Sequence, residues 1–449
     1  MANSTGDRER RAAYRSGMQS LATLKLVCVV CAEGYAADRA RIRCECGGTL
    51  DVVHDIQAMR GKLSVDIFDQ RLGSIRPEDR SGVWRFRELI LPIDPEEIVT
   101  RGEGRTNLYP APDLATRAGV GALLLKHEGE NPTGSFKDRG MTAGVSVARA
   151  LGKARVACAS TGNTSASMAS FAAACGMEAI VFIPDGQIAY GKLSQALAFG
   201  ARTLQIDGDF DAAMALVEDL CTQESTYLLN SVNPFRIEGQ KSIGFELLQD
   251  MGWEVPDWIV LPGGNLGNSS AIAKGLLELR ELGLISKLPR MAVVQAAGAN
   301  PLYTAWTTGA PLEPIAHAET LASAIRIGAP VSWRKCLRGL RALDGVVCEV
   351  SDQEILDAKA HIDGAGIGAE PASCATFAGI CKLAAQGTLG PGNTVCGILT
   401  GHLLKDPDVV VQYHRGELDG FSTGLANAPR TVACDIDAIR GVLREYAPR

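Results

Sequence analysis

The chain has 449 residues, of which 46% are hydrophobic and 21% charged, a profile typical of a globular protein with two or three domains. Its net charge of −6, without any Lys/Arg block, argues against general nucleic-acid binding, and no apolar run is long enough to cross a membrane. No secretory signal is recognised, and the thirteen cysteines are an odd number and mostly scattered, which predicts reduced thiols in the cytoplasm.

Two close pairs of cysteines lie near the N-terminus, Cys28 with Cys31 and Cys44 with Cys46. Two thiolate pairs on two turns can hold a zinc ion in tetrahedral geometry, as zinc ribbons do. The first pair has the usual spacing and the second is one residue shorter, so the alternative is that the cysteines only pack or have lost their metal. The sequence predicts a small zinc-ribbon-like module that is separate from the main body of the protein.

From Leu123 onward, short β-branched runs alternate with glycine-containing turns and with amphipathic or Ala-rich helical patterns. Strands that alternate with helices imply right-handed βαβ units and parallel sheets covered on both faces, which is an α/β fold. Ligands in such folds bind at the carboxyl ends of strands, near helix N-termini. The runs expected to be strands are 155–159, 179–183, 203–206, 226–229, 257–261, 291–295, 346–350 and 394–399.

The stretch from Lys126 to Gly140 places a lysine at the start of a predicted helix. Ser135 and Asp138 have the spacing of a capping box, and the residues after them continue with helical spacing. Lys137 therefore lies in the first helical turn, beside the positive end of the helix dipole and next to Arg139. Partial desolvation there is expected to lower its pKa and to favour the free amine, which attacks carbonyls. For this motif alone, a solvated surface lysine is the alternative.

Two further stretches follow predicted strands and open helices, where free backbone N–H groups and the helix dipole favour anions. The segment 160–167 carries hydroxyl groups suited to a carboxylate and an amide, Asn163, suited to a ring oxygen; an ordinary capped turn is the alternative. The segment 262–270 is glycine-rich and can close around a phosphate, although its spacing is not the dinucleotide fingerprint. Together with the lysine, these features suit pyridoxal phosphate and an amino-acid substrate.

The three stretches in combination resemble the threonine synthase family, of the fold type II (tryptophan-synthase-β-like) class of pyridoxal phosphate enzymes. The resemblance spans residues 25–415. One departure is Asn107, where the family has proline after the threonine. The matching segments are Asn-Pro-Thr-Gly-Ser-Phe-Lys-Asp-Arg-Gly (131–140), Ser-Thr-Gly-Asn-Thr-Ser-Ala-Ser (160–167) and Pro-Gly-Gly-Asn-Leu-Gly-Asn (262–268), with 230–241, 324–328 and 400–407.

The resemblance implies how the cofactor, pyridoxal 5′-phosphate, is bound. Lys137 is the catalytic residue and carries the cofactor covalently, Asn163 contacts its ring oxygen, and Thr400 meets its pyridine nitrogen. The residues that surround the cofactor phosphate are Gly264, Asn265, Leu266, Gly267 and Asn268.

The resemblance also implies how the substrate is held. Arg236 supplies the planar fork that a phosphate prefers. The residues assigned to the substrate carboxylate are Ser160, Thr161 and Thr164, and those assigned to the phosphate of O-phospho-L-homoserine are Asn230, Ser231 and Arg236.

The implied protein is a two-domain α/β enzyme with parallel-rich sheets flanked by helices, plus the zinc-ribbon-like module. The expected segments are 1–60 for the N-terminal part with that module, 61–145 and 240–430 for the larger cofactor-binding domain, 146–239 for the smaller α/β domain, and 431–449 for a C-terminal tail.

The implied activity is that of a carbon-oxygen lyase, which converts O-phospho-L-homoserine and water to L-threonine and phosphate by γ-elimination and β-addition, in a homodimer. One alternative is a pyridoxal phosphate dehydratase or replacement enzyme acting on another amino acid, which need not bind a substrate anion at 230–236. A catalytically dead binding protein is the other alternative, against which the lysine and both anion cradles argue.

Overall fold

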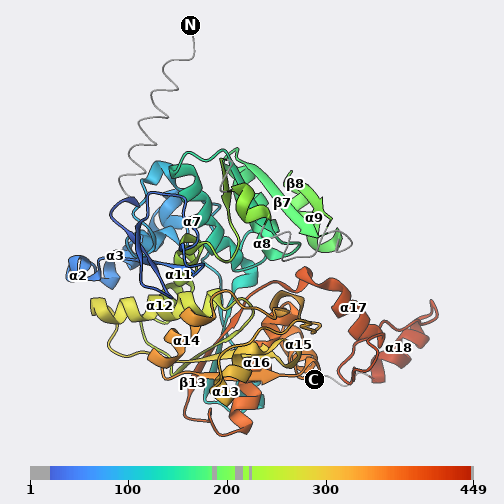
Figure 1. Ribbon diagram of the computed structural model, residues 1–449. Helices are drawn as coiled ribbons and strands as arrows, with labels where there is room; N and C mark the ends of the chain where they lie inside the picture. The colour runs from blue at the N-terminus through green and yellow to red at the C-terminus, as the bar shows by residue number, and fades with distance from the viewer. Residues whose placement is uncertain (1–20, 185–189, 208–215, 222–224, 446–449) are drawn as a thin grey trace. The chain divides into compact units, whose positions relative to one another are not determined.

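The computed structural model describes residues 21–184, 190–207, 216–221 and 225–445 (Figure 1). The chain forms two compact units, of which the first ends at Lys405 and the second begins at Asp406. The first unit contains three sheets, whose strands are joined largely through helices. None of the helices in the described residues combines the length and the apolar character that a membrane crossing requires.

The largest sheet has the strand order β12-β11-β10-β13-β5-β4, and all its pairs are parallel except that of β4 with β5. Alternate residues of β10 belong to two core clusters, so the strand is buried on both faces. One cluster joins the sheet to α6, α15 and α16, and the other joins it to α11, α12 and α14. The strands are β4 (Leu108–Pro110), β5 (Ala122–His127), β10 (Trp258–Pro262), β11 (Arg290–Ala296), β12 (Val346–Val350) and β13 (Thr394–Leu399). The helices are α6 (Pro112–Ala118), α11 (Pro234–Asp250), α12 (Gly267–Leu282), α14 (Trp333–Ala342), α15 (Asp352–Gly364) and α16 (Pro371–Ala385).

The second sheet is wholly parallel, with the order β8-β7-β6-β9 (Figure 1). Its strands are β6 (Arg155–Ala159), β7 (Glu178–Pro184), β8 (Arg202–Ile206) and β9 (Thr226–Leu228), and its helices include α8 (Asn163–Ala174) and α9 (Tyr190–Ala198). α7 (Lys137–Ala150) leads from the larger sheet into this one. All eight strands predicted from the sequence are confirmed, with ends shifted by no more than one residue.

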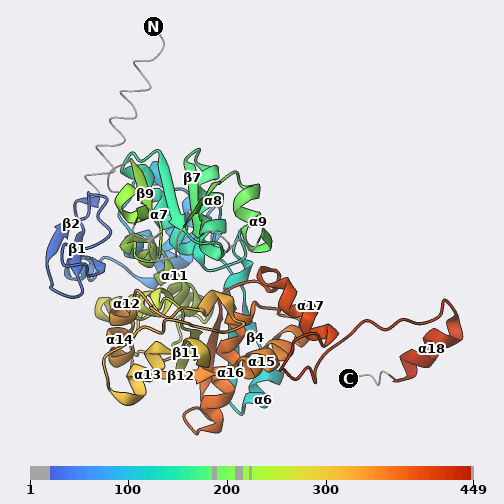
Figure 2. The same cartoon turned by 45° about the vertical axis from the view of Figure 1, so that its right-hand side comes forward.

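The N-terminal residues form a small antiparallel sheet with the order β2-β1-β3, two strands of which are labelled in Figure 2. Its strands are β1 (Lys25–Cys28), β2 (Gly34–Ala36) and β3 (Leu50–Val53). The prediction of a module separate from the main body is wrong, because Leu26, Leu50 and Val52 belong to the same core cluster as α11 and α12. Further helices among the described residues of this unit are α2 (Ile56–Met59), α3 (Val65–Gln70), α4 (Pro77–Arg80), α5 (Arg87–Ile90) and α13 (Pro301–Thr308).

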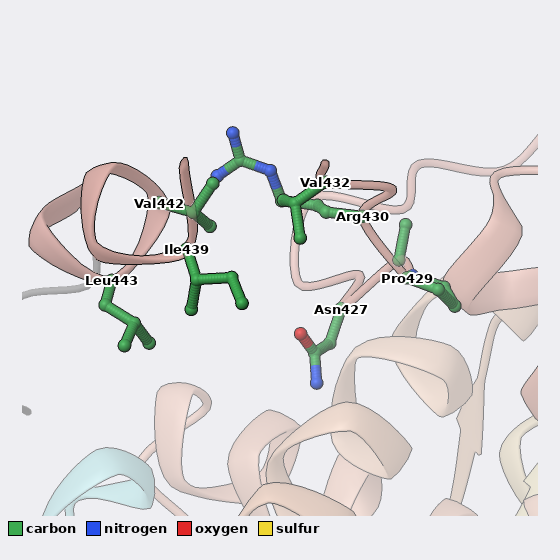
Figure 3. A pocket seen from close by; sticks show the side chains of 8 residues that line it. Asn427, Pro429, Arg430, Val432, Ile439, Val442 and Leu443 are labelled. Carbon is green, nitrogen blue, oxygen red and sulfur yellow. The ribbon is translucent and has the colours of Figure 1, made fainter. Parts of the chain in front are cut away.

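The second unit contains α17 (Pro407–Arg415) and α18 (Ile436–Glu445). Within it, Arg430 pairs with Glu445 at 2.7 Å between Nη1 and Oε2. Figure 3 shows a pocket of this unit, whose lining residues are Asn427, Ala428, Pro429, Arg430, Val432, Ile439, Val442 and Leu443.

Candidate active site

Lys137 is the first residue of α7, as the sequence predicts, but the predicted capping box is wrong. The helix begins at Phe136 without a capping side chain, and Ser135 Oγ has no partner among the described residues. The Asp138 carboxylate instead turns back to the preceding loop, where it accepts from Thr133 N at 2.7 Å and from Thr133 Oγ1 at 2.6 Å. The loop is thereby fastened to the helix that carries the lysine.

Burial and, to a smaller extent, the nearby charge of Arg236 lower the pKa of Lys137 to about 7, against the opposing effect of Glu370. The prediction that Arg139 lowers the pKa of Lys137 is wrong. Arg139 is buried and paired, with its Nε 2.6 Å from Glu128 and its Nη2 2.7 Å from Glu246, so that its charge is compensated locally. At neutral pH a substantial share of Lys137 is therefore the free amine, the nucleophilic form.

The segment predicted to bind a carboxylate lies between β6 and α8. α8 starts after Gly162 with no capping side chain, so the backbone N–H groups of its first turn have no intrahelical acceptor. Ser160 Oγ accepts from Gly162 N at 3.2 Å, and Thr164 is buried. Thr161 is half-buried beside them. Hydroxyls and free N–H groups at a helix start form a cradle that favours an anion.

The glycine-rich segment lies between β10 and α12, and it also opens a helix without a capping side chain. The residue before α12, Leu266, has a φ of +62°, which turns the backbone sharply. A side chain at Gly264 would come within 3.2 Å of the backbone at Ala324 and Ile325. Asn268 is buried, and neither its Oδ1 nor its Nδ2 has a partner among the described residues. A narrow backbone cradle with an unpaired buried amide fits a phosphate group.

The other two residues of this segment differ in what they do. Asn265 is occupied by structural bonds, since its backbone oxygen accepts from Ser332 N at 3.1 Å and its Oδ1 accepts from Val331 N at 3.4 Å. Gly267 faces Gln240 of α11, whose Oε1 lies 3.8 Å from the position of a Cβ at Gly267 and has no partner among the described residues. Gln240 Nε2 also approaches Gly140 of α7, so this side chain lies between the three helices.

Glu370 connects the residues predicted to hold the cofactor ring, and the sequence analysis missed it. Its Oε2 accepts from Asn163 Nδ2 at 3.0 Å, and its Oε1 accepts from Thr400 Oγ1 at 3.4 Å. Thr400 Oγ1 also lies 3.0 Å from Ser373 Oγ. Glu370 comes directly before α16, and the Glu-Pro pair that opens this helix was the available signal, although it names no partner.

Arg236 is a buried guanidinium without a carboxylate partner among the ion pairs of the described residues. Asn233 caps α11 by accepting from the backbone N–H of Phe235 and Arg236, which fixes the start of the helix. Arg236 Nη1 donates to Leu229 O at 2.6 Å, and Nε has no partner in the part of the chain that the structure describes. Burial lowers the pKa of Arg236 to about 10. A buried cation with unused donors is costly unless an anion joins it.

Gly144 of α7 leaves the space that Arg236 occupies, since a Cβ there would lie 3.0 Å from Arg236 Cγ. The other two residues predicted to bind the substrate phosphate are Asn230 and Ser231. Asn230 pairs with the backbone of Ala159 at 2.9 Å and 3.1 Å, which ties β9 to the end of β6. Ser231 follows and is half-buried.

The side chains of the four N-terminal cysteines converge, and their four Sγ atoms all lie within 4.8 Å of one another. Cys28 Sγ and Cys46 Sγ are 3.5 Å apart, as are Cys31 Sγ and Cys44 Sγ. This is close to the spacing of about 3.8 Å that four sulfurs adopt around a tetrahedral zinc with bonds of about 2.3 Å.

A second group of possible ligands comprises His54, Glu238 and Glu278. Its centre is already taken by a lysine: the ammonium of Lys241 lies 2.6 Å from Glu238 Oε2 and 2.6 Å from Glu278 Oε2. This group is therefore a buried ion-pair network.

Comparison with known proteins adds three observations. Residues 99–401 match the family described as pyridoxal-phosphate dependent enzyme. The chain is 46% identical to the threonine synthase of Methanosarcina acetivorans, over 92% of this chain and 97% of that protein, and 41% identical to the threonine synthase of Methanocaldococcus jannaschii, over 93% and 99%. Its fold is similar to that of Escherichia coli threonine synthase, with a TM-score of 0.66 at 20% identity over 94% and 99% of the two chains, and to that of maize serine racemase, with a TM-score of 0.59 at 20% identity over 70% and 93%.

Proposed function

Because the chain belongs to the threonine synthases, a family of pyridoxal-phosphate dependent enzymes, we propose that it converts O-phospho-L-homoserine and water to L-threonine and phosphate. It is a lyase of threonine biosynthesis. The observation that carries the substrate assignment is the buried guanidinium of Arg236, which lacks a carboxylate partner among the described residues and lies close enough to Lys137 to lower the pKa of that amine. A phosphate on the substrate would supply the missing negative charge beside the reactive amine.

We assign the cofactor to the residues that fit it. Gly264, Leu266 and Gly267 would surround its phosphate with backbone, and the unpaired amide of Asn268 would bond to it. Asn265 would contribute backbone alone, since its side chain is engaged elsewhere. When bound, pyridoxal phosphate withdraws electrons from the carbons of the amino acid attached to it.

At the ring, Asn163 and Thr400 would contact the cofactor oxygen and the pyridine nitrogen, both held by Glu370. A neutral hydroxyl at that nitrogen does not keep it protonated as a carboxylate would.

The substrate would be oriented from two sides. Ser160, Thr161 and Thr164, at the start of α8, would bind its carboxylate. Arg236, with Ser231 and Asn230 beside it, would bind its phosphate.

Lys137 would then move the protons: its free amine takes one proton from Cα and one from Cβ, releasing the first before it accepts the second. One proton goes to Cγ, which phosphate leaves, and one returns to Cα after the OH of water has added at Cβ, while the remaining proton of the water leaves with the phosphate. A pKa near neutral suits both directions of this transfer.

We further propose that Cys28, Cys31, Cys44 and Cys46 bind a structural zinc ion, supported by the spacing of their sulfurs. We also propose that the protein forms a homodimer and is located in the cytoplasm. All thirteen cysteines are free thiols, which suits a reducing compartment.

The division into domains remains our proposal as well. The strands of the largest sheet fall within 61–145 and 240–430, and those of the second sheet fall within 146–239, which supports a larger and a smaller lobe. The proposed division also includes an N-terminal segment, 1–60, and a C-terminal segment, 431–449.

One assay tests the proposed reaction. The purified holoenzyme should release phosphate and form threonine from O-phosphohomoserine in equal amounts, with phosphoserine and threonine as comparison substrates. A dehydratase would instead deaminate threonine and ignore the phosphate. Ammonia release from threonine at a rate above that of phosphate release from phosphohomoserine would refute the proposal.

A further inference from the structure

We propose that the four-cysteine module is a clasp: with metal bound, the segment 37–43 holds the second sheet in place and thereby sets the position of the substrate-phosphate segment. The inference rests on the proposed metal site, and its functional consequence rests on the proposed reaction. The clasp has three parts: an anchored side (β3), a tip (Ile42 and Arg43) and the turn 44–49, whose position depends on the metal.

The anchored side is β3, which is bonded to three helices of the first unit. Lys335 donates to Leu50 O and Lys274 donates to Val52 O. Asp51 is buried among these cations; burial alone would raise its pKa, but Lys274 and Lys335 hold the pKa at about 2. These contacts fix β3 on α12 and α14 whether or not the cysteines hold a metal.

β3 also reaches the helix that carries Arg236. His54 Nε2 lies 2.8 Å from Glu238 Oε2, and both side chains are buried. Glu238 is two residues beyond Arg236 on α11, so the anchored side of the module and the proposed phosphate-binding side chain share one helix turn.

The tip is the pair Ile42 and Arg43, which contacts the second sheet. Arg43 forms a two-point bond with Glu218, with its Nε 2.9 Å from Oε2 and its Nη2 3.0 Å from Oε1. Glu218 belongs to the helical residues 216–221. Both side chains are partly shielded from solvent, being 36% and 24% exposed, so the pair is stronger than a fully exposed one.

Ile42 packs against an apolar cluster that includes Val217, Phe182 and Val232. Val232 directly follows Ser231 of the proposed substrate-phosphate segment. Val331, which packs against the same cluster, donates its N–H to Asn265 Oδ1 of the glycine-rich segment. The cluster under the tip is therefore continuous with both proposed phosphate cradles.

The metal would set the position of the tip through the turn 44–49. Arg43 pairs with Thr49 across this turn and donates to Gly47 O, while Cys44 N donates to Gly48 O. The cysteine sulfurs that bring the turn onto β1 lie within 4.8 Å of one another, a spacing at which thiolates repel unless a cation lies between them. Without the ion, the turn keeps the backbone bond from Val29 N to Thr49 O at its end but loses the link of Cys44 and Cys46 to β1, and the tip is held less firmly.

The test compares Arg43→Ala with Arg41→Ala in the full-length holoenzyme. Arg41 is a matched control two residues away, because it lies over the Tyr35 ring at 4.2 Å and, among the described residues, forms its ion pair with exposed Glu45. Three quantities are measured for each: zinc per chain, hydrogen exchange of the backbone amides of 216–221, and KM for O-phosphohomoserine. The wild-type enzyme treated with a chelator is the fourth sample.

Arg43→Ala should keep its zinc, exchange the amides of 216–221 about fivefold faster and raise KM about fivefold, since one shielded ion pair is lost. Arg41→Ala should match the wild type, and chelation should reproduce the exchange change of Arg43→Ala. Wild-type exchange in Arg43→Ala overturns the clasp, and unchanged exchange on metal removal overturns the role of the metal. If no variant or wild type turns over phosphohomoserine, the proposed reaction fails, while the exchange data still decide the clasp.

Discussion

Replacement of Arg236 tests the proposed substrate more sharply than any other change. The side chain is 1% exposed, and its hydrogen bond within the described residues runs from Nη1 to the backbone oxygen of Leu229, which leaves donors free for a phosphate. Truncation of a buried, charged hydrogen bond costs about 2–5 kcal/mol, which is roughly a 30- to 5000-fold loss in kcat/KM. We expect Arg236→Leu to fall in this range, and Arg236→Lys to lose less because it keeps the charge but not the fork.

The two variants should also differ in their pH profiles. The charge of Arg236, after burial, holds the pKa of Lys137 near 7. Arg236→Leu removes that charge, so the pKa of Lys137 rises and less free amine is present at a given pH. In the holoenzyme, Lys137 is a free amine only once the substrate is bound, so the profile to follow is that of kcat. Its acid limb should move to higher pH in the leucine variant and stay near its wild-type position in the lysine variant.

The assay is phosphate release from O-phosphohomoserine across a pH series, with the visible absorbance of the bound cofactor recorded for each variant. Arg155→Leu is the control, since Arg155 lies on β6 and pairs with Glu178 at a 49% exposed site. Cofactor absorbance should persist in Arg236→Leu, because the cofactor phosphate is assigned to Gly264–Asn268. Lost absorbance together with lost turnover, both recovered at high cofactor concentration, would mean that the two phosphate sites are exchanged, and no change in either would refute a phosphorylated substrate.

Four further changes test the remaining assignments. Lys137→Ala should abolish turnover and the borohydride-stable attachment of the cofactor seen by mass spectrometry; more than trace turnover would contradict its role. Glu370→Gln should lower the pKa of Lys137 further, because the carboxylate opposes the shift, so the acid limb should move to lower pH; an upward shift would contradict the assignment. Gly144→Ala should lower kcat/KM although alanine favours helices by about 1 kcal/mol, because the new Cβ would lie 2.6 Å from Leu229 Cδ2 and 3.0 Å from Arg236 Cγ; equal kcat/KM would show that both side chains can shift without moving the guanidinium. Cys31→Ser should lose zinc and lower Tm while the cofactor stays bound, and retained zinc by metal analysis would remove the four-sulfur site.

Local pattern was sufficient for much of this protein. All eight strands expected from the β-branched runs are present, because a short apolar run between glycine turns has few other ways to bury itself in an α/β chain. The cysteine spacing likewise predicted a cluster that the structure brings together, since a thiol pair a few residues apart on one turn converges by backbone geometry alone. In both cases the signal is carried by residues that lie close together in the sequence.

Partners distant in sequence were decided only by the tertiary structure. Arg139 looked like the neighbour that perturbs Lys137, yet its partners Glu128 and Glu246 lie 11 and 107 residues away and compensate its charge. Glu370 lies 207 residues from Asn163, and no local pattern pairs them.

The partners of the N-terminal module were likewise decided only by the tertiary structure. Its internal pattern resembled an independent unit, while the carbonyl oxygens of β3 are satisfied by Lys274 and Lys335, more than two hundred residues further along the chain. A buried donor or acceptor must find a partner, and only the assembled fold determines which one lies within reach.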